Sequence, residues 1–90
     1  MILKDILLYE TIRVCNKSEL SEILKYFEKY NINHNFYISD MYSYPTNIHY
    51  NHNFNNINFG KRKKTDIPIY FKTIKNKFSM LEKLKTIIDN

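Results

Sequence analysis

The sequence has one cysteine, one glycine and no tryptophan, alanine or glutamine among its 90 residues. The single cysteine, Cys15, excludes a disulfide bond within the chain and is typical of proteins from reducing compartments. With Gly60 as the only glycine, a glycine-rich phosphate-binding loop is excluded. The N-terminal apolar run is interrupted by Lys4 and Asp5, which makes it too short for a signal peptide or a membrane-spanning helix. We therefore expect a cytoplasmic protein, located in the host cytoplasm if a phage encodes it.

We expect a single α+β domain over residues 1–90, and its length allows only one modest core. A chain of 11.0 kDa buries only about 65% of the surface that its unfolded form exposes. Hydrophobic residues make up 43% of the sequence, but eight of them are tyrosines, whose hydroxyl groups need hydrogen-bond partners or water. Some tyrosines are therefore expected at the surface. The abundance of Asn, Lys, Ile and Tyr is what an AT-rich coding sequence would give.

Positive charge is concentrated in the last third of the chain. The formal net charge is +5 and the pI is about 9.3. Residues 1–60 carry five Lys or Arg against six Asp or Glu, a net of −1, whereas residues 61–90 carry nine against three, a net of +6. Because coding bias alone can raise the number of lysines, the position of the charges is more informative than their total.

The first part of the chain is predicted to form a strand followed by a helix. Residues 8–15 follow a period of two, as in a half-buried strand. Asn16 and Glu19 form a capping-box pattern, with Ser18 as a competing cap, and begin the most clearly defined helix. The apolar residues of this helix recur at helical spacing: Leu20, Ile23, Leu24, Phe27 and Tyr30.

Two further strands are predicted after a polar break at residues 31–35. Residues 36–44 are rich in aromatic and β-branched side chains, which favour a strand. A turn is expected at 44–47, because Pro45 presets the backbone for its first central position. Residues 48–54 then alternate cleanly. This alternation predicts four inward side chains: Ile48, Tyr50, His52 and Phe54.

Asn55 and Asn56 break the alternation, which is consistent with a bulge or with a two-residue hairpin turn, since asparagine tolerates positive φ. We favour the bulge, with Ile57 and Phe59 returning to the inward face. Residues 60–66 are expected to form a charged loop.

The last part of the chain is predicted to form a strand over residues 67–72 and a terminal helix. Pro68 lacks an N–H group, which places this strand at a sheet edge or places Pro68 at its start. An amphipathic helix is expected over residues 78–88 with Asn76 as its cap, although a fifth strand at 78–80 followed by a shorter helix fits equally well. The inward side chains of the strand would be Ile67, Ile69 and Phe71.

These elements predict a β-α-β-β-β-α order. Each helix has one apolar stripe and the strands have one apolar and one mixed face, which favours a mostly antiparallel sheet with two helices on one face. The other face would be open to solvent. It would carry some of the following side chains: Tyr37, Met41, His49, Tyr70 and Lys72.

A metal site or a catalytic site is not indicated by the residue spacing. His49 and His52 have an HxxH spacing, but residues three apart on a strand point to opposite faces. Cys15, His34 and Asp40 could complete a ligand set only if the fold brought them together. Cys15 ends a predicted strand in a chain without a second domain to form a cleft, and Asp40 has no partner carboxylate for acid–base chemistry. We expect no metal, no cofactor and no enzymatic activity.

Binding is the function that the sequence favours. Lys61, Arg62, Lys63 and Lys64 form a continuous basic run, and further lysines follow it. Such a set could neutralise phosphates, while exposed tyrosines are common at protein interfaces and can stack on bases. The predicted binding residues are Lys61, Arg62, Lys63, Lys64, Tyr70, Lys72, Lys75, Lys77, Tyr37 and His49.

The leading hypothesis is a small accessory or inhibitory protein from a phage or other mobile element. It would bind a host or defence protein through the open sheet face and the basic segment 61–77, and would block that partner by occupancy. The alternative is a nucleic-acid-binding module that uses the same basic segment. A third option is a homodimer, formed through an edge strand, that sequesters a small molecule. The sequence does not identify the partner.

Overall fold

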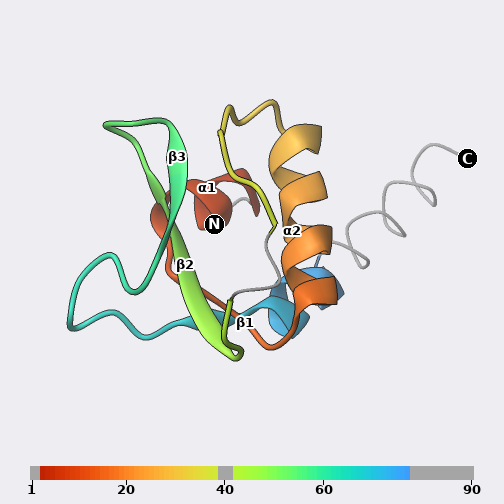
Figure 1. Ribbon diagram of the computed structural model, residues 1–90, viewed down its shortest axis with the longest axis vertical. Coiled ribbons are helices and arrows are strands. Elements are labelled where there is room, and N and C mark those ends of the chain that lie inside the picture. Colours follow the sequence, from red (N-terminus) through yellow and green to blue (C-terminus); the bar gives the residue numbers. More distant parts are fainter. Residues whose placement is uncertain (1–2, 39–41, 78–90) are drawn as a thin grey trace, which may run out of the picture.

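A computed structural model of the chain describes residues 3–38 and 42–77 (Figure 1). In this part of the chain, three helices pack around one sheet: α1 (Leu3–Tyr9), α2 (Lys17–Lys29) and a helix over residues 71–77. The strands are β1 (Ile12–Val14), β2 (Thr46–Asn51), β3 (Asn56–Phe59) and β4 (Ile69–Tyr70). The predicted α+β class is confirmed, but the predicted order is not, because a helix precedes the first strand.

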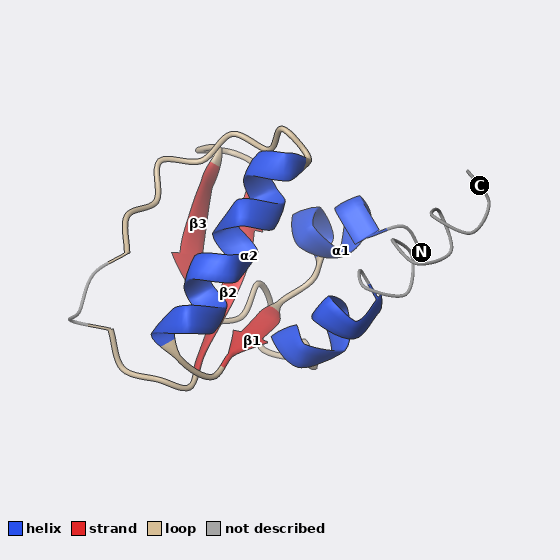
Figure 2. Cartoon of the chain, turned by 90° about the vertical axis from the view of Figure 1, so that its right-hand side faces the viewer, coloured by secondary structure: helices blue, strands red, loops and turns tan. Residues whose placement is uncertain are grey.

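The sheet has four strands in the order β3-β2-β1-β4. β1 pairs with β2 and β2 pairs with β3 in antiparallel orientation, whereas β4 joins β1 in parallel. β3 and β4 are therefore the edge strands. The position of β4 agrees with Pro68 directly before it, since proline cannot donate a hydrogen bond to a neighbouring strand. α2 crosses one face of this sheet (Figure 2).

The core lies between α2 and the sheet face that α2 covers. Phe27 of α2 stacks on Tyr50 of β2 with ring centroids 6.0 Å apart. α1 and the helix over residues 71–77 close the core at its margins, each with apolar side chains that are almost fully buried. The buried hydrophobic residues form one cluster: Leu3, Ile6, Leu7, Ile12, Val14, Leu20, Ile23, Leu24, Phe27, Ile32, Ile48, Tyr50, Ile57, Phe71 and Ile74.

The start of α2 is formed by the side chains that the capping pattern predicts. Asn16 Oδ1 accepts a hydrogen bond from the Glu19 N–H at 2.9 Å, and Glu19 Oε1 accepts one from the Cys15 N–H at 2.9 Å. These bonds satisfy backbone donors that have no partner within the helix. Beyond the helix, Asn31 adopts a φ of 57°, and this left-handed residue turns the chain out of the helical path.

The predicted strand over residues 8–15 is wrong in its first half. Leu8 and Tyr9 belong to α1, and only Ile12–Val14 form a strand. The period of two in this segment coincides with a helical pattern that begins earlier, in which Leu3, Ile6 and Leu7 are buried at helical spacing. Burial of that apolar face outweighs the local alternation.

The predicted strand over residues 36–44 is also wrong, since residues 36–38 and 42–44 have no regular secondary structure. The rings of Phe36 and Tyr42 instead pack on the end of β3. The ring of Phe59 lies 5.5 Å from that of Phe36 and 4.3 Å from that of Tyr42. Aromatic content therefore indicated burial against the sheet, not a strand. Met41, predicted for the open sheet face, lies outside the described residues.

β2 and β3 form a hairpin, so the favoured bulge at residues 55–56 is wrong and the hairpin alternative is closer. Asn51 pairs with Asn56, which leaves residues 52–55 as the turn. Asn51 Oδ1 accepts hydrogen bonds from the backbone N–H groups of residues 53 and 54, and Asn55 has a φ of 49°. His52 and Phe54, both predicted to point inward, are exposed in this turn.

The predicted strand over residues 67–72 is reduced to Ile69–Tyr70, after which the chain becomes helical. Phe71 and Ile74, three residues apart, are both buried. Ile67 was expected to point inward, yet 87% of it is exposed. Asn76 lies inside the helix and does not cap it. The predicted helix over 78–88 and its alternative strand lie outside the described residues.

Candidate binding surface

The sheet face opposite α2 is polar and carries an arginine at its centre. Arg13 of β1 is paired in register with Asn47 of β2 on one side and with Tyr70 of β4 on the other, so these three side chains share a face. His49 and Asn58, paired across β2 and β3, continue the same face. Arg13 Nη1 donates to Asn47 Oδ1 at 3.3 Å. No helix among residues 3–38 and 42–77 covers this face, in agreement with Figure 1, where α2 lies on the other side.

A groove of about 290 Å³ lies on this face. We call it the cationic groove, and it is lined by Arg13, Asn47, Lys61, Ile67, Pro68 and Tyr70. It combines two cations, an amide and a phenol with an apolar wall, and it contains no carboxylate. Tyr70 is 53% exposed there. The chemistry of this lining suits a negatively charged group next to an apolar one.

The loop between β3 and β4 forms one wall of the cationic groove and leaves the sheet on the side away from α2 (Figure 1). Gly60 has a φ of 102°, which turns the chain at the end of β3. The Gly60 N–H donates to the Asn47 carbonyl at 2.7 Å, and His49 Nδ1 lies 2.9 Å from the Gly60 carbonyl oxygen. The end of the groove wall that follows β3 is thus attached to β2.

Arg62 is an anchor of this loop, although it lies in the middle of the basic run. Its Nη2 donates to the carbonyl oxygens of Leu8 at 2.7 Å and Tyr50 at 2.9 Å. Its backbone N–H donates to Thr11 Oγ1 at 3.1 Å. The guanidinium therefore links α1, β2 and the loop, and it is half-buried. Its charge satisfies the protein's own carbonyl groups, which makes it a poor contact for a partner.

Asp66 holds the other half of the loop. Its Oδ2 accepts from Thr11 Oγ1 at 2.9 Å and from the Lys63 N–H at 3.0 Å. The pKa of Asp66 lies below its ordinary value of 3.8, mainly because of the hydrogen bond from Thr11. Desolvation opposes this shift and is the second largest effect, and the Lys63 N–H and the charges of Lys63 and Arg62 lower the pKa further. The ionised form of Asp66 therefore stabilises the loop.

This pKa shift predicts a loss of stability in acid. Because the folded-state pKa lies below the unfolded one, the contribution of Asp66 is fully present above pH 3.8 and is lost as the pH falls through the folded-state pKa. We expect Asp66→Asn, which keeps an acceptor for Thr11 but does not titrate, to flatten the acid limb of a plot of unfolding free energy against pH. Urea titrations from neutral to acid pH measure this. Glu28→Gln, at an exposed carboxylate on α2, is the control, and an equal flattening by both changes would contradict the prediction.

The predicted binding residues fall into separate groups. Lys61 lines the cationic groove, and Lys63 and Lys64 are exposed on the same loop. The helix over 71–77 lies beside α2 instead, since Phe71 packs on Tyr26 with ring centroids 6.1 Å apart. The exposed lysines of that helix are Lys72, Lys75 and Lys77.

Lys75 is also engaged with α2, because its Nζ lies 2.9 Å from Glu22 Oε2. The hydrogen bond and the charge of Glu22 raise the pKa of Lys75 above 10.5. The basic segment 61–77 thus presents its two ends on different sides of the sheet. Tyr70 and His49 lie on the open face, whereas Tyr37 is 81% exposed beside the edge of β3.

Four groove residues were not singled out by sequence reasoning: Arg13, Asn47, Ile67 and Pro68. A signal existed for Arg13, because it alternates between the buried residues Ile12 and Val14 and so must point away from the core. The other three come next to Arg13 only through the pairing of β1 with both β2 and β4, which no local pattern predicts.

The two closely spaced histidines do not converge. His49 lies on the open face, whereas His52 stacks on Tyr9 at 5.1 Å and places Nε2 2.7 Å from the Leu8 carbonyl oxygen. In the described part of the chain, no group of three or more His, Cys, Asp or Glu side chains is arranged to hold a metal ion. Cys15 is exposed, and Asp40 lies outside the described residues.

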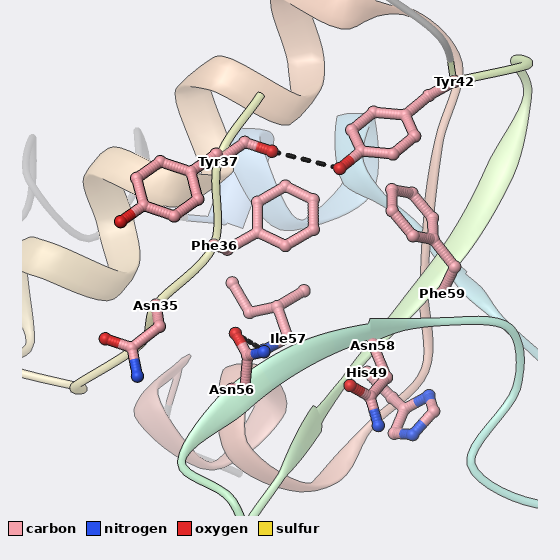
Figure 3. Close-up of a pocket in the computed structure, with 9 residues that line it drawn as sticks. All are labelled: Asn35, Phe36, Tyr37, Tyr42, His49, Asn56, Ile57, Asn58 and Phe59. Atoms are coloured by element: carbon pink, nitrogen blue, oxygen red, sulfur yellow. Dashed lines mark hydrogen bonds between the residues drawn. The ribbon is translucent and has the colours of Figure 1, made fainter. Parts of the chain in front are cut away.

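A second hollow of about 570 Å³ lies at the edge of β3, and we call it the edge cleft (Figure 3). Phe36, Tyr37 and Tyr42 form one side, and β3 forms the other. The Tyr42 hydroxyl donates to the Tyr37 carbonyl at 3.1 Å, which ties the two flanks of the aromatic side together. The cleft is lined by aromatic and asparagine side chains together with His49 and Ile57, and its lining contains no Lys, Arg, Asp or Glu.

The chain matches no protein-family model, no curated protein sequence and no solved structure. Fold and site geometry together define it as a small α+β domain with an open, cationic sheet face. Over residues 3–38 and 42–77, no helix combines the length and apolar character needed to cross a membrane.

Proposed function

We propose that the protein acts by binding, and that it recognises an acidic surface of another protein through the cationic groove. The single observation that supports this proposal is that Arg13 and Lys61 line the same groove as an exposed tyrosine, Tyr70, and that no carboxylate lines it. Arginine and tyrosine are among the side chains enriched at the centres of protein interfaces. A glutamate or aspartate of the partner would pair with the cations while a neighbouring apolar side chain contacts Ile67 and Pro68.

Occupancy is the proposed mode of action. A domain of 90 residues that covers an acidic patch can block access to that patch without any chemical step. The AT-rich composition and small size are typical of accessory proteins from phages and mobile elements. The proposed partner is therefore a host or defence protein whose working surface is acidic, and positive charge on the loop would also speed the encounter.

Charge placement favours a protein over nucleic acid as the partner. A nucleic-acid backbone is bound by cations that follow successive phosphates. Here the guanidinium of Arg62 is used inside the fold, Lys75 is paired with Glu22, and the remaining lysines of 61–77 lie on two sides of the sheet. A compact groove with two cations suits one or two carboxylates better than a row of phosphates.

Removing the two groove charges tests the proposal. We expect Arg13→Gln combined with Lys61→Gln to weaken binding of the partner at least about tenfold, because each cation loses a charge-assisted contact. The partner is first captured from host lysate and identified, and its affinity is then measured by calorimetry. Lys72→Gln combined with Lys77→Gln removes the same charge from the other side of the sheet and is the matched control. Equal weakening by both pairs would show a non-specific charge effect and contradict the groove.

Direct binding of nucleic acid is the second candidate, and one observation favours it. Lys61 and Lys64 are exposed on the loop beside Tyr70, and neither forms an ion pair within the described residues. Stacking of a base on Tyr70 with phosphates on these lysines is a known mode for single strands. Binding of a fluorescent oligonucleotide at increasing salt tests this candidate, since affinity that falls steeply with salt and is lost in Tyr70→Ala would favour nucleic acid over protein.

A further inference from the structure

The cationic groove contains side-chain donors that the protein itself leaves unused. Arg13 uses Nη1 for the hydrogen bond to Asn47 Oδ1, and its other guanidinium N–H groups have no acceptor among the described residues. Because Asn47 accepts this bond through its oxygen, both N–H donors of its amide are left for a ligand. Within the described residues, neither Arg13 nor Lys61 forms an ion pair, and the Tyr70 hydroxyl has no hydrogen-bond partner. Four side chains therefore offer free donors to one small groove.

These donors enter the groove from different parts of the fold. Arg13 belongs to β1, Asn47 to β2 and Tyr70 to β4, and the register places the three side by side across the open face. Lys61 adds a cation from the loop. A carboxylate accepts hydrogen bonds in the plane of its two oxygens, whereas a phosphate group presents three strong acceptor oxygens around a tetrahedral centre. Donors from three strands and a loop suit the tetrahedral group better.

The charge balance of the groove also favours a phosphate group. Arg13 and Lys61 bring two positive charges, and no carboxylate lines the groove. A carboxylate carries one negative charge, whereas a phosphate monoester carries about 1.5 to 2 at pH 7. Arg13 is half-buried, so its unpaired charge interacts with an anion more strongly than a fully solvated charge would. One phosphate monoester can therefore neutralise both cations, which a single carboxylate cannot.

The apolar part of the groove determines which molecule carries the phosphate. Ile67, which is 87% exposed, and Pro68 line the same groove as the cations. A volume of about 290 Å³ lies at the lower end of the range for ligand pockets, which is small for a nucleotide with its base, sugar and phosphate. In phosphotyrosine, the phosphate is attached directly to a flat apolar ring. This one side chain therefore satisfies both the cations and the apolar wall.

We propose that the cationic groove binds a phosphotyrosine side chain of the partner protein. Arg13, Lys61 and Asn47 would hold the phosphate, while the aromatic ring contacts Ile67 and Pro68. The inference rests on the proposed function, because it takes the partner to be a protein and names the acidic group that the groove recognises. The partner would then be bound after a kinase has modified it and released when the phosphate is removed.

Small probes test the groove before any partner is known. The probes are the N-acetyl amides of phosphotyrosine, tyrosine, phosphoserine and glutamate, and NMR titration of the purified chain measures the affinity of each. We expect phosphotyrosine to bind at least about tenfold more tightly than glutamate because of its additional charge, and more tightly than phosphoserine because of its ring. The unphosphorylated tyrosine probe should show no binding. The backbone N–H signals that respond should include residues 13, 47, 61 and 70.

Matched variants show where the probe binds. Arg13→Gln combined with Lys61→Gln should weaken binding of the phosphotyrosine probe at least about tenfold, because both charge-assisted contacts are lost. Lys72→Gln combined with Lys77→Gln removes the same charge from the other side of the sheet and should leave the affinity nearly unchanged. Circular dichroism and thermal unfolding establish that both double variants fold.

The possible outcomes separate this inference from the proposed function. Phosphotyrosine and glutamate probes that bind equally well, both through Arg13 and Lys61, would overturn the phosphotyrosine assignment and leave recognition of an acidic surface standing. A phosphotyrosine probe that does not bind, or that binds equally to both double variants, would overturn it as well. Phosphatase treatment of the captured partner gives a further test, since an affinity for the groove that survives this treatment would contradict this inference alone.

Discussion

Phe71→Ala is expected to lower the free energy of unfolding by about 3–5 kcal/mol, the range for removing a fully buried phenylalanine. Only 1% of Phe71 is exposed, and its ring packs against Tyr26 of α2. Tyr70→Ala, one residue earlier, removes a side chain that is 53% exposed and should cost about 1 kcal/mol or less. Chemical denaturation of the two variants measures the difference.

The contrast between Phe71 and Tyr70 tests the change from strand to helix at this point of the chain. Tyr70→Ala should nevertheless weaken partner binding, because its ring lines the cationic groove. The pair thus separates stability from binding at adjacent positions. A Tyr70→Ala variant that loses as much stability as Phe71→Ala would mean that Tyr70 belongs to the core and not to the groove.

Arg62→Ala is the second change with a large expected effect, a loss of about 3 kcal/mol. Its guanidinium donates two charge-assisted hydrogen bonds, to the carbonyl oxygens of Leu8 and Tyr50, and each such bond contributes roughly 1.5–3 kcal/mol. For a domain of this size, such a loss lowers the melting temperature by about 12–24 °C. Lys61→Ala, at the exposed neighbour, should change stability by about 0.5 kcal/mol or less.

Arg62→Lys is the informative companion, because a lysine ammonium cannot reproduce the planar fork that reaches both carbonyl groups. We expect it to restore less than half of the lost stability. Equal melting temperatures for Arg62→Ala and Lys61→Ala would contradict the anchoring role. The distinction also affects binding experiments, since reversing all of residues 61–64 to acidic side chains would disrupt the loop itself. Only Lys61, Lys63 and Lys64 can be changed without that complication.

The parts of the fold that were predicted correctly are those in which the local pattern and the tertiary environment agree. α2 is one of these parts, because its start and its buried face are both encoded in one segment of sequence. The capping box of Asn16 and Glu19 marks its start, and the apolar stripe marks the face that packs on the sheet. The charged loop after Gly60 was also predicted from a single segment of sequence. The missing N–H of Pro68 predicted either an edge strand or a strand that starts at Pro68, and β4 is an edge strand that begins directly after Pro68.

The errors in predicted secondary structure share one physical cause. Alternation and aromatic content indicate that side chains are buried, but they do not determine whether the backbone forms a strand, a helix or a loop. Phe36 and Tyr42 are packed on Phe59 without forming a strand. Phe71 belongs to a helix, although its spacing from Ile69 suggested a strand. The cationic groove was predicted only in part because Arg13 and Lys61 meet through the pairing of β1 with both neighbours. Such long-range pairing leaves no local signature in the sequence.

The carbonyl oxygen of Leu8 accepts hydrogen bonds from His52 Nε2 and from Arg62 Nη2. The last turn of α1 therefore supports both the hairpin turn and the basic loop. Loss of residues 3–8 would remove this shared acceptor together with the buried side chains of Leu3, Ile6 and Leu7, so it should loosen the hairpin turn, the basic loop and the margin of the core at once. Because Lys61 of the cationic groove lies on that loop, the proposed binding would depend on a helix that contributes no residue to the groove.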